Sequence, residues 1–438
     1  MKRPPFPALV FVLIMFASPL LGAERFPRPE LPPDHVQPVT SRPMPPGPFY
    51  GWIDTAVLVV TLALAAHLAL RRRSRAAIFA VMLFSLVYFG FYRKGCICPI
   101  GAIQRVAESL GTGSAVSVFA LLFFGVPLIF ALFFGRVFCS SVCPLGAIQD
   151  VVLLRPLKVP AWLEHGLRLF AYAYLGLAVL FAVTGAGYVI CRYDPFVSFF
   201  RLSGGMQMFL LGISFLVTCL FVGRAYCRFL CPLGVLLGLA SRVSRWRTTI
   251  TPDECIKCRL CEDACPFGSI RKPTAEPTGA NRTEGKLRLG LLVLALPLVI
   301  ATGAVLGHAA GDVLARAHPT VLRAREVRAA GAGTPGDEAL RTQAFLKTGR
   351  TLEQLRADEQ NVLAEFGVGT AILGGFLGLV VGGRLVALSV RRTRTDYEAD
   401  RGRCVACGRC FAHCPREHVR RQKLRGEPIL IKDQAGKT

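Results

Sequence analysis

The sequence predicts an all-α polytopic membrane protein, with about 7–8 transmembrane helices judged from its apolar runs. Of the 438 residues, 53% are hydrophobic and 18% are charged, a composition too apolar for a soluble domain. Arginine blocks follow several apolar runs, which is typical of loops on the cytoplasmic side of a membrane. This rule, together with membrane lipid as a partner, accounts for the formal net charge of +24, so we expect no nucleic-acid partner.

The N-terminal segment has the pattern of an export signal. Residues 1–23 combine Lys2 and Arg3 with an apolar run and the small residues Gly22 and Ala23, which predicts a signal sequence or an N-terminal anchor. Residues 24–50 are rich in proline and lack apolar periodicity. They are expected to form a periplasmic linker rather than a domain.

Residues 51–248 are predicted to form the main membrane domain. The first apolar run ends at an arginine block, Arg71, Arg72, Arg73 and Arg75, which marks the cytoplasmic side and fixes the direction of the runs that follow. The predicted spans cover residues 53–70, 76–92, 115–134, 169–186 and 206–222. The turns that contain Cys96, Cys98 and Cys191 are then expected on the periplasmic side.

Residues 286–390 are predicted to form a transmembrane hairpin with a periplasmic loop at 308–364. Within the loop, Thr351 and Gln354 have the spacing of a capping box that opens a helix. In the last span, glycines recur every four residues, which predicts close packing between helices. These glycines are Gly374, Gly378 and Gly382.

Two cysteine motifs flank this hairpin. CIKCRLCEDACP (255–266) lies in the segment 249–275, and CVACGRCFAHCP (404–415) lies in the segment 395–438 with the C-terminal tail. Spacings of two, two and three residues before a proline match the ligand run of bacterial [4Fe-4S] ferredoxins. Structural zinc is the alternative, but it usually takes two C-x2-C pairs with a longer spacer.

In ferredoxins with two clusters, the fourth cysteine of each motif ligates the other cluster. The sequence therefore predicts two [4Fe-4S] clusters, with iron bound by crossed cysteine sets, in a module assembled from two separated segments. Cluster 1 is assigned to Cys255, Cys258, Cys261 and Cys414. Cluster 2 is assigned to Cys404, Cys407, Cys410 and Cys265. Two crossings return the chain to its starting side, so both motifs are expected in the cytoplasm.

An internal repeat lies within the membrane domain. GRVFCSSVCPLG (135–146) and GRAYCRFLCPLG (223–234) are nearly the same, and each follows an inward-going span. Two units in the same orientation predict a parallel repeat about an axis along the membrane normal. Cysteines four apart share one helical face, and the proline is expected to end or bend that turn.

The repeat brings further cysteines into consideration. Cys139, Cys143, Cys227 and Cys231 could present four thiols to one point, as a metal or cluster site, as a redox dithiol, or as buried thiols. Disulfides are not expected in a reducing cytoplasm. Cys96, Cys98 and Cys191 are a candidate for another redox site on the periplasmic side.

The tandem C-x3-CP pairs, joined to two ferredoxin motifs, resemble the NosR/NapH-type membrane-bound polyferredoxins, a family of 4Fe-4S binding proteins. The resemblance covers roughly residues 50–270 and 390–420. It implies that the membrane part takes electrons from quinol and passes them through iron-sulfur clusters toward a periplasmic acceptor. NapH-like proteins keep the two ferredoxin motifs close together, whereas a helical hairpin separates them here.

Two functional hypotheses follow. The first is an electron-transfer protein of the bacterial inner membrane that draws on the quinone pool and reduces a periplasmic or membrane redox protein, as a subunit of a quinol dehydrogenase. The second is a redox-active assembly or regulatory factor for a metalloenzyme. His67, near the cytoplasmic end of its span, and Glu164 and His165, at the start of another, are candidates for handling quinol protons. A packed histidine and interfacial polar residues are the alternative.

Overall fold

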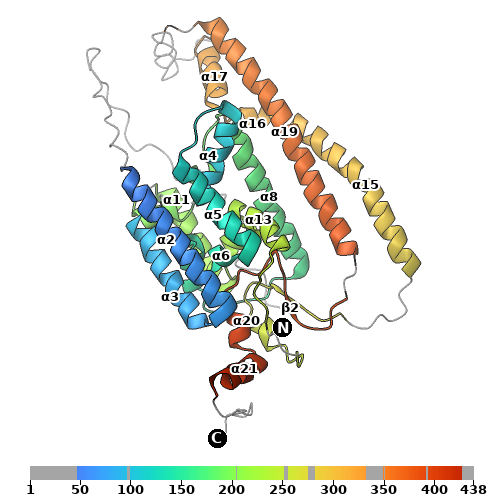
Figure 1. Ribbon diagram of the computed structural model, residues 1–438. Coiled ribbons are helices and arrows are strands. Elements are labelled where there is room, and N and C mark those ends of the chain that lie inside the picture. Colours follow the sequence, from blue (N-terminus) through green and yellow to red (C-terminus); the bar gives the residue numbers. More distant parts are fainter. Residues whose placement is uncertain are drawn as a thin grey trace.

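The computed structural model describes residues 47–95, 99–203, 205–250, 255–274, 282–331, 349, 351–390 and 393–426. The predicted signal segment 1–23, nearly all of the linker 24–50, Cys96 and Cys98 lie outside these residues. The described chain is mostly helical, and its hydrophobic core lies inside the bundle formed by the first two thirds of the chain (Figure 1).

The first half of the bundle contains the first arginine block and the first C-x3-CP segment. Its elements are α2 (Pro48–His67), the π-helical η2 (Leu68–Arg72), α3 (Arg75–Ser85), the π-helical η3 (Leu86–Tyr92), α4 (Pro99–Thr112), α5 (Val118–Phe134), α6 (Val137–Ser141) and α7 (Pro144–Val151). The second half contains the second C-x3-CP segment. Its elements are α8 (Ala161–Val183), α9 (Val189–Arg192), α10 (Val197–Arg201), α11 (Met206–Phe221), α12 (Ala225–Phe229), α13 (Pro232–Ala240) and the 3-10 turn η4 (Ser241–Val243).

The hairpin and the two ferredoxin motifs follow. The first motif contains α14 (Leu260–Asp263) and β1 (Ile270–Arg271). The hairpin consists of α15 (Arg282–Ala309), α16 (Gly311–Ala315), α17 (Pro319–Gly331) and α19 (Leu352–Ser389). The second motif contains β2 (Glu398–Ala399), α20 (Arg409–Ala412) and α21 (Pro415–Arg425).

Five described helices are long and apolar enough to cross a membrane. They cover Pro48–Arg72, Arg75–Tyr92, Ala161–Val183, Gly285–Ala309 and Leu352–Ser389. The predicted spans 115–134 and 206–222 form shorter apolar helices, α5 and α11. Helix α5 ends at Phe134, and the next residue, Gly135, has a φ of 74° and a ψ of −164°, a backbone conformation that favours glycine and does not continue the helix.

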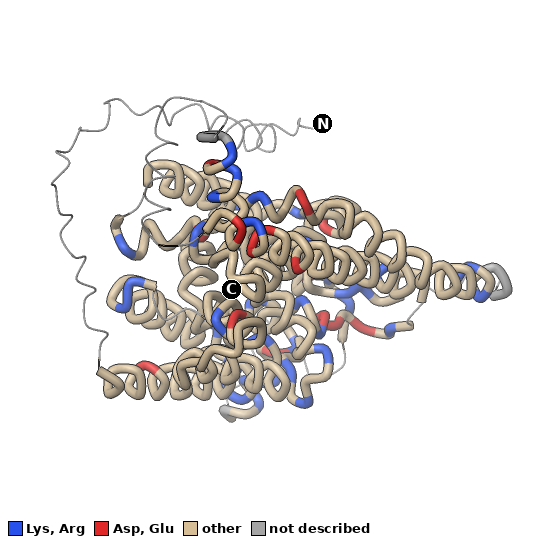
Figure 2. Tube along the Cα trace, turned by 90° about the horizontal axis from the view of Figure 1, so that it is seen from above, with Lys and Arg blue, Asp and Glu red and all other residues tan. Residues whose placement is uncertain are grey.

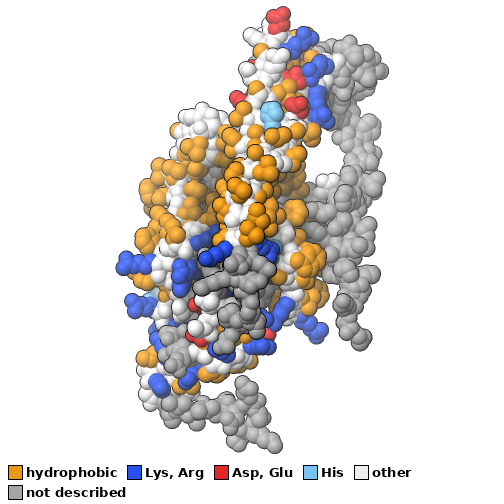
Figure 3. Space-filling model, turned by 90° about the vertical axis from the view of Figure 1, so that its right-hand side faces the viewer, with side chains coloured by type: hydrophobic (Ala, Val, Ile, Leu, Met, Phe, Trp, Pro, Cys, Tyr) orange, Lys and Arg blue, Asp and Glu red, His pale blue; other side chains and the backbone are white. Residues whose placement is uncertain are grey.

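The surface agrees with a membrane-embedded protein. Viewed from above, charged residues gather in loops and at helix ends, while the helices themselves are mostly uncharged (Figure 2). From the side, hydrophobic side chains form a band across the middle of the molecule, with Lys and Arg at both ends of it (Figure 3). Lipid chains would cover such a band, so these exposed apolar side chains do not require a protein partner.

The hairpin packs through its glycines, as the sequence predicted. A Cβ atom on Gly374 would lie 2.0 Å from the carbonyl oxygen of Gly303, and one on Gly378 would lie 2.6 Å from that of Val299. The two backbones therefore touch directly, which is the usual role of regularly spaced small residues in membrane helices. The capping box at Thr351 and Gln354 is confirmed as well, and it opens α19.

Substitution of Gly374 by Leu is expected to separate α15 from α19, because no side chain fits between the backbones. The expected cost is about 1–3 kcal/mol or more of hairpin stability, measured as a lower thermal midpoint and as faster proteolysis of the hairpin. Gly383, on the same helix, is the control, because a Cβ atom there would meet nothing within 4 Å. Equal effects of Gly374→Leu and Gly383→Leu would contradict this account of the packing.

Helix α8 connects the hairpin to the bundle. Its neighbour α19 runs antiparallel to it, since Phe181 meets Phe366 at one end and Tyr172 meets Phe376 further along. A Cβ atom on Gly176 would lie 2.2 Å from Leu373 Cδ1, between these two pairs. Positions along α8 can therefore be used to compare how far other residues lie from the ferredoxin motifs. The first turn of α8, at Glu164, is the end near these motifs, and Val183 is at the opposite end.

Candidate cysteine sites

The two ferredoxin loops share one backbone conformation. In the first loop, the residues on either side of the second cysteine, Lys257 and Arg259, have φ values of 54° and 65°. In the second loop, the equivalent residues, Ala406 and Gly408, have φ values of 57° and 78°. Non-glycine residues rarely adopt positive φ. The same two left-handed residues at the same places therefore indicate that both loops curl around an object of one shape.

A small sheet joins the two loops, one of which precedes the hairpin in the sequence while the other follows it. β1 pairs with β2 in antiparallel register, with Ile270 opposite Ala399 and Arg271 opposite Glu398. Beside it, the Asp400 amide donates to the Ser269 carbonyl at 2.8 Å. These bonds join segments more than a hundred residues apart, so the structure brings together the two motifs that the sequence predicted to meet.

The first group of thiols lies in the first loop. Burial, followed by the nearby Cys255, Cys258 and Cys414 thiols, raises the pKa of Cys261 to about 12. Burial also raises the pKa of Cys414, and its neighbouring thiols are Cys258 and Cys255. Cys414 therefore lies with the thiols of the first motif, although it belongs to the second.

The second group forms a small cavity. Cys265, Cys404, Cys407 and Cys410 all line it. Burial raises the pKa of Cys404 to about 12, and the Cys407 and Cys265 thiols contribute further. Thiols packed so closely would remain protonated unless a metal compensated the thiolate charge, so this donor set fits an iron-sulfur cluster. The crossed ligand sets remain our prediction, and the grouping of the thiols is what it requires.

The two C-x3-CP segments have matching local geometry. In the first, the Val142 and Cys143 amides both donate to the Phe138 carbonyl, each at 3.0 Å. In the second, the Leu230 and Cys231 amides both donate to the Tyr226 carbonyl, at 2.8 and 3.0 Å. Corresponding residues thus make corresponding hydrogen bonds in the two segments.

The prolines of these segments do not end the helical turns that contain the first cysteines. Helix α6 already ends at Ser141, and Cys143 is the N-cap of α7, with Pro144 at its first position. Cys231 and Pro232 have the same places in α13. The expectation that proline closes the turn was therefore wrong: proline lacks an amide hydrogen and suits the start of a helix.

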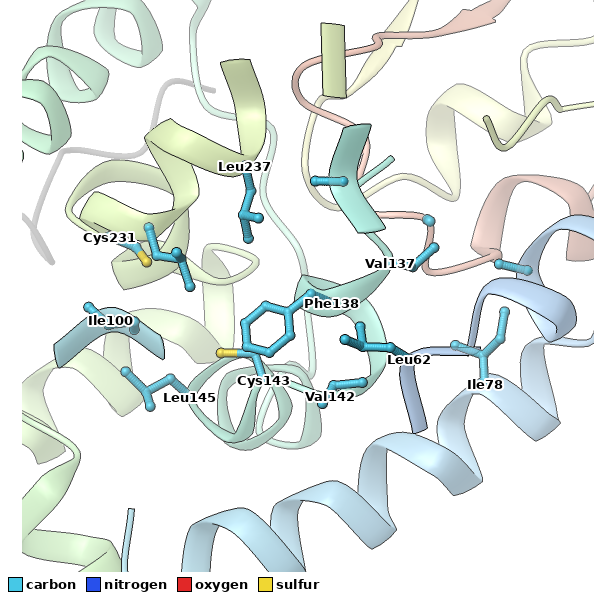
Figure 4. Packing of buried hydrophobic residues seen from close by; sticks show 14 of the residues in the cluster. Leu62, Ile78, Ile100, Val137, Phe138, Val142, Cys143, Leu145, Cys231 and Leu237 are labelled. Atoms are coloured by element: carbon cyan, nitrogen blue, oxygen red, sulfur yellow. The ribbon is translucent and has the colours of Figure 1, made fainter. Parts of the chain in front are cut away.

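All four C-x3-CP thiols converge. Cys143 lies within electrostatic range of Cys227, Cys139 and Cys231, and Cys231 lies within range of Cys227 and Cys139. Figure 4 shows Cys143 and Cys231 in one packed cluster, near Leu145, Phe138 and Ile100. We call these four cysteines the thiol tetrad. Among the described residues, no group of three or more His, Cys, Asp or Glu side chains is arranged to hold a single metal ion.

Gln149 holds Cys227, one member of the tetrad, by a hydrogen bond from its side chain. Its Nε2 donates to the Cys227 sulfur at 3.2 Å and to the Leu145 carbonyl at 2.7 Å, while its Oε1 accepts from the Tyr226 amide at 3.1 Å. The equivalent residue of the second segment, Leu237, is fully buried and apolar. At this supporting position, only the first of the two units has a polar side chain.

Substitution of Gln149 by Leu, the residue of the second segment, is expected to destabilise the protein. It leaves the buried Tyr226 amide without its acceptor, which costs about 1–3 kcal/mol. A lower thermal midpoint, together with altered reactivity of Cys227 toward alkylating reagents, would confirm it. An unchanged midpoint and unchanged Cys227 reactivity would show that Gln149 does not position the tetrad.

The tetrad lies directly against the second ferredoxin loop. Cys139 packs against the cluster formed by Phe267, Val405 and Cys407. The guanidinium of Arg224 lies 5.4 Å from the ring centroid of Phe267. No long gap therefore separates the ferredoxin module from the tetrad.

Cys191 is exposed and lies beside the first turn of α4. Cys191, the buried Asp194 and Cys231 all lie within electrostatic range of Tyr174 in α8, and the periplasmic placement of this turn stays a prediction. A Cβ atom on Gly101 would lie 3.3 Å from the Cys191 sulfur, and one on Gly111 would meet Val183. Helix α4 therefore runs along α8 from the level of Cys191 to Val183.

Glu164 forms ion pairs with three arginines. It pairs with Arg168 at 3.1 Å, Arg228 at 2.9 Å and Arg403 at 3.4 Å, while His165 contacts Arg403 at 3.4 Å. Both carboxylate oxygens of Glu164 are therefore engaged in ion pairs. The interpretation of Glu164 and His165 as interfacial polar residues is therefore favoured.

Three residues of the site escaped sequence reasoning: Arg136, Arg224 and Asp150. Arg136 and Arg224 occupy equivalent positions in the repeated G-R-x2-C motif, so the repeat itself carried a signal. Asp150 forms ion pairs with Arg75 and Arg224, both at 3.4 Å, and with Arg409 at 3.2 Å. It therefore links the membrane bundle to the second ferredoxin motif.

Apolar spans together with two ferredoxin loops and a thiol tetrad define a membrane-bound iron-sulfur protein. One family model, described as a 4Fe-4S binding domain, matches the chain twice, at residues 116–161 and 205–251. A second model of the same description matches residues 248–271. The twice-matched segments contain the thiol tetrad and none of the eight ferredoxin cysteines.

Several known proteins share these segments. The uncharacterized protein MJ0750 of Methanocaldococcus jannaschii is 29% identical over 41% of this chain and 77% of its own length. YccM of Escherichia coli, whose name proposes a role in electron transport, is 28% identical over 38% of this chain and 52% of its own length. The regulatory protein NosR of Pseudomonas aeruginosa is 30% identical over 27% of this chain and 18% of its own length. No solved structure matches the chain significantly.

These matches support a likeness of this chain to the NosR/NapH-type 4Fe-4S membrane proteins. The match spans only about half of YccM and less than a fifth of NosR. The activities of those whole proteins are therefore considered for this chain only as proposals.

Proposed function

We propose that this protein transfers electrons, drawn from quinol, through iron-sulfur clusters toward a periplasmic redox enzyme. The observation that carries the proposal is the continuous order of thiol groups. The first ferredoxin group adjoins the second through the shared sheet, and the second adjoins the tetrad through Cys139. Cys231 of the tetrad and Cys191 both lie within electrostatic range of Tyr174 in α8. The names of the related proteins also favour electron transport.

The eight ferredoxin cysteines are proposed to hold two [4Fe-4S] clusters in the crossed sets given above. A [4Fe-4S] cluster exchanges single electrons without the transfer of atoms. The thiol tetrad is proposed to hold a third centre of the same kind. This is supported by the match of its two segments to a 4Fe-4S binding model and by the equivalent places of its cysteines.

The two C-x3-CP units are proposed to be parallel repeats about an axis along the membrane normal, and the ferredoxin module is proposed to be cytoplasmic. The arginine block at the end of the first span supports this orientation. The opposite side would then carry α17 and the first turns of α19. These helices are joined by the pairs of Arg328 with Glu359 at 2.6 and 3.0 Å, and this small exported unit could meet the acceptor.

Metal and sulfide analysis with EPR on the purified protein tests the number of centres. Three clusters predict about twelve iron atoms and about twelve acid-labile sulfides per chain. No zinc is expected in the same analysis. The variant Cys143→Ser/Cys231→Ser is expected to lower both counts to about eight. Counts of about eight in the unaltered protein would exclude a cluster on the tetrad, and zinc without sulfide would exclude the whole proposal.

The second candidate function, an assembly or regulatory factor, is favoured by the name of the regulatory protein NosR. Quinol added to membranes distinguishes the two. Reduction of the clusters, followed by EPR, supports electron transfer. Clusters that stay oxidised, with cofactor-poor partner enzyme in a deletion strain, support the assembly factor.

A further inference from the structure

Two arginines lie between the thiol tetrad and the ferredoxin module. Arg136 and Arg224 precede Cys139 and Cys227 by three residues each, so they are the same residue of the two C-x3-CP segments. Arg224 is 2% exposed, and the Nε atoms of both arginines are enclosed without a hydrogen-bond partner in the described chain.

Each arginine reaches across into the other segment. Nη1 of Arg224 donates to the Cys139 carbonyl, and it would lie 3.3 Å from a Cβ atom on Gly146. Nη2 of Arg136 would lie 3.2 Å from a Cβ atom on Gly234, the glycine equivalent to Gly146. The repeated C-P-L-G sequence therefore leaves room in each segment for the guanidinium of the opposite one.

The two arginines differ in the group that balances their positive charge. Arg224 pairs with Asp150 at 3.4 Å, but that carboxylate is shared with Arg75 and Arg409. At the position equivalent to Asp150, the second segment has Gly238, where a Cβ atom would lie 3.1 Å from the Gly402 carbonyl oxygen. On the side of Arg136, the Gly402 carbonyl thus lies where the Asp150 carboxylate lies on the side of Arg224.

Arg136 is consequently left with thiols as its anionic neighbours. Its Nη1 donates to the Gly402 carbonyl at 3.1 Å, and its Nη2 lies 3.6 Å from the Cys139 sulfur. Cys231 and Cys227 are also within electrostatic range, and no carboxylate of the described residues pairs with it. A partly buried cation without a counter-ion is unfavourable, whereas tetrad thiolates would supply the missing negative charge.

We propose that Arg136 and Arg224 are the counter-charges of an anionic, thiolate-ligated centre on the tetrad and that they raise its reduction potential. This inference rests on the third centre of the proposed function. When that centre accepts one electron from the cluster of the second ferredoxin group, that cluster is oxidised and the tetrad gains one negative charge. Two enclosed guanidinium groups stabilise the added charge and favour reduction.

The test is a redox titration, followed by EPR, of the full-length protein with Arg136→Gln and Arg224→Gln. Each variant is expected to make reduction of the tetrad centre at least tenfold less favourable, which lowers its potential by 59 mV for one electron. Arg136→Lys and Arg224→Lys retain the charge and should restore most of the potential. The first ferredoxin group has neither arginine among its nearest charged neighbours and is the internal reference.

Arg93→Gln is the matched control. Arg93 also has an enclosed, unpartnered Nε, but it pairs with Asp54 at 2.5 Å on the opposite part of the bundle. If a third centre is present and its potential is the same in the Gln variants as in Arg93→Gln, the inference is wrong while the proposed function stands. If the unaltered protein has no third centre, the tetrad part of the proposed function fails first, and the inference fails with it. Loss of the centre in the Gln variants, with retention in the Lys variants, supports the charge role.

Discussion

Serine at position 414 is expected to abolish the cluster of the first ferredoxin motif, although Cys414 belongs to the second. Its thiol lies with those of Cys255, Cys258 and Cys261. A serine hydroxyl is a much weaker ligand for iron than a thiolate, so Cys414→Ser should lose about four iron and four sulfide per chain. EPR of the reduced protein would show which cluster signal disappears.

Cys265→Ser is the reciprocal control for this experiment. Cys265 belongs to the first motif but lines the cavity of Cys404, Cys407 and Cys410, so its replacement should remove the other cluster. The two variants must therefore lose different EPR signals. If Cys414→Ser loses the cluster held by the second loop, the crossed assignment is wrong.

Asparagine at position 150 is expected to be the most destabilising of the single polar substitutions considered. The Asp150 side chain is fully buried and lies among Arg75, Arg224 and Arg409. Asparagine has the same shape, but it would leave the buried Arg224 and the partly buried Arg75 and Arg409 without their shared anion. Removing one partner of a buried ion pair costs about 3–5 kcal/mol. A lower thermal midpoint and loss of contact between the ferredoxin module and the bundle should be observed.

Asp263→Asn is the control for that substitution. Asp263 also pairs with a cation, Lys158 at 2.6 Å, but both side chains are mostly exposed to solvent. Water and salt screen such a pair, so no measurable change in the midpoint is expected. Comparable effects of Asp150→Asn and Asp263→Asn would contradict the structural role of Asp150.

The same carboxylate predicts how stability depends on pH. Burial alone would raise the pKa of Asp150, but Arg224, Arg409 and Arg75 outweigh it and hold the pKa below its ordinary value of 3.8. Because the pKa is lower in the folded than in the unfolded protein, this stabilisation is complete above pH 4 and is lost as the pH falls through the folded value. Asp150→Asn should reduce the acid sensitivity of the midpoint below pH 4, and an unchanged acid limb would contradict the assignment.

Features that depend on neighbours along the chain could be predicted from the sequence. The apolar runs, the capping box at Thr351 and the glycine contacts of α19 follow from composition and short spacing, and the structure bears them out. The spacing of the ferredoxin cysteines likewise indicated loops that hold a cluster. Proline was misjudged in the C-x3-CP segments, because the pattern alone does not show whether proline ends one helix or begins the next.

The sequence by itself thus determined the class of protein, its main spans and its cysteine motifs, since hydrophobicity and ligand spacing are properties of short segments. Only the tertiary structure decided which motifs meet. Asp150 and Arg409, for example, are 259 residues apart along the chain yet hydrogen-bonded. It also decided that Arg136 and Arg224 each reach across into the other C-x3-CP segment. Such contacts depend on how helices pack, and packing energy arises between surfaces that no local pattern brings together.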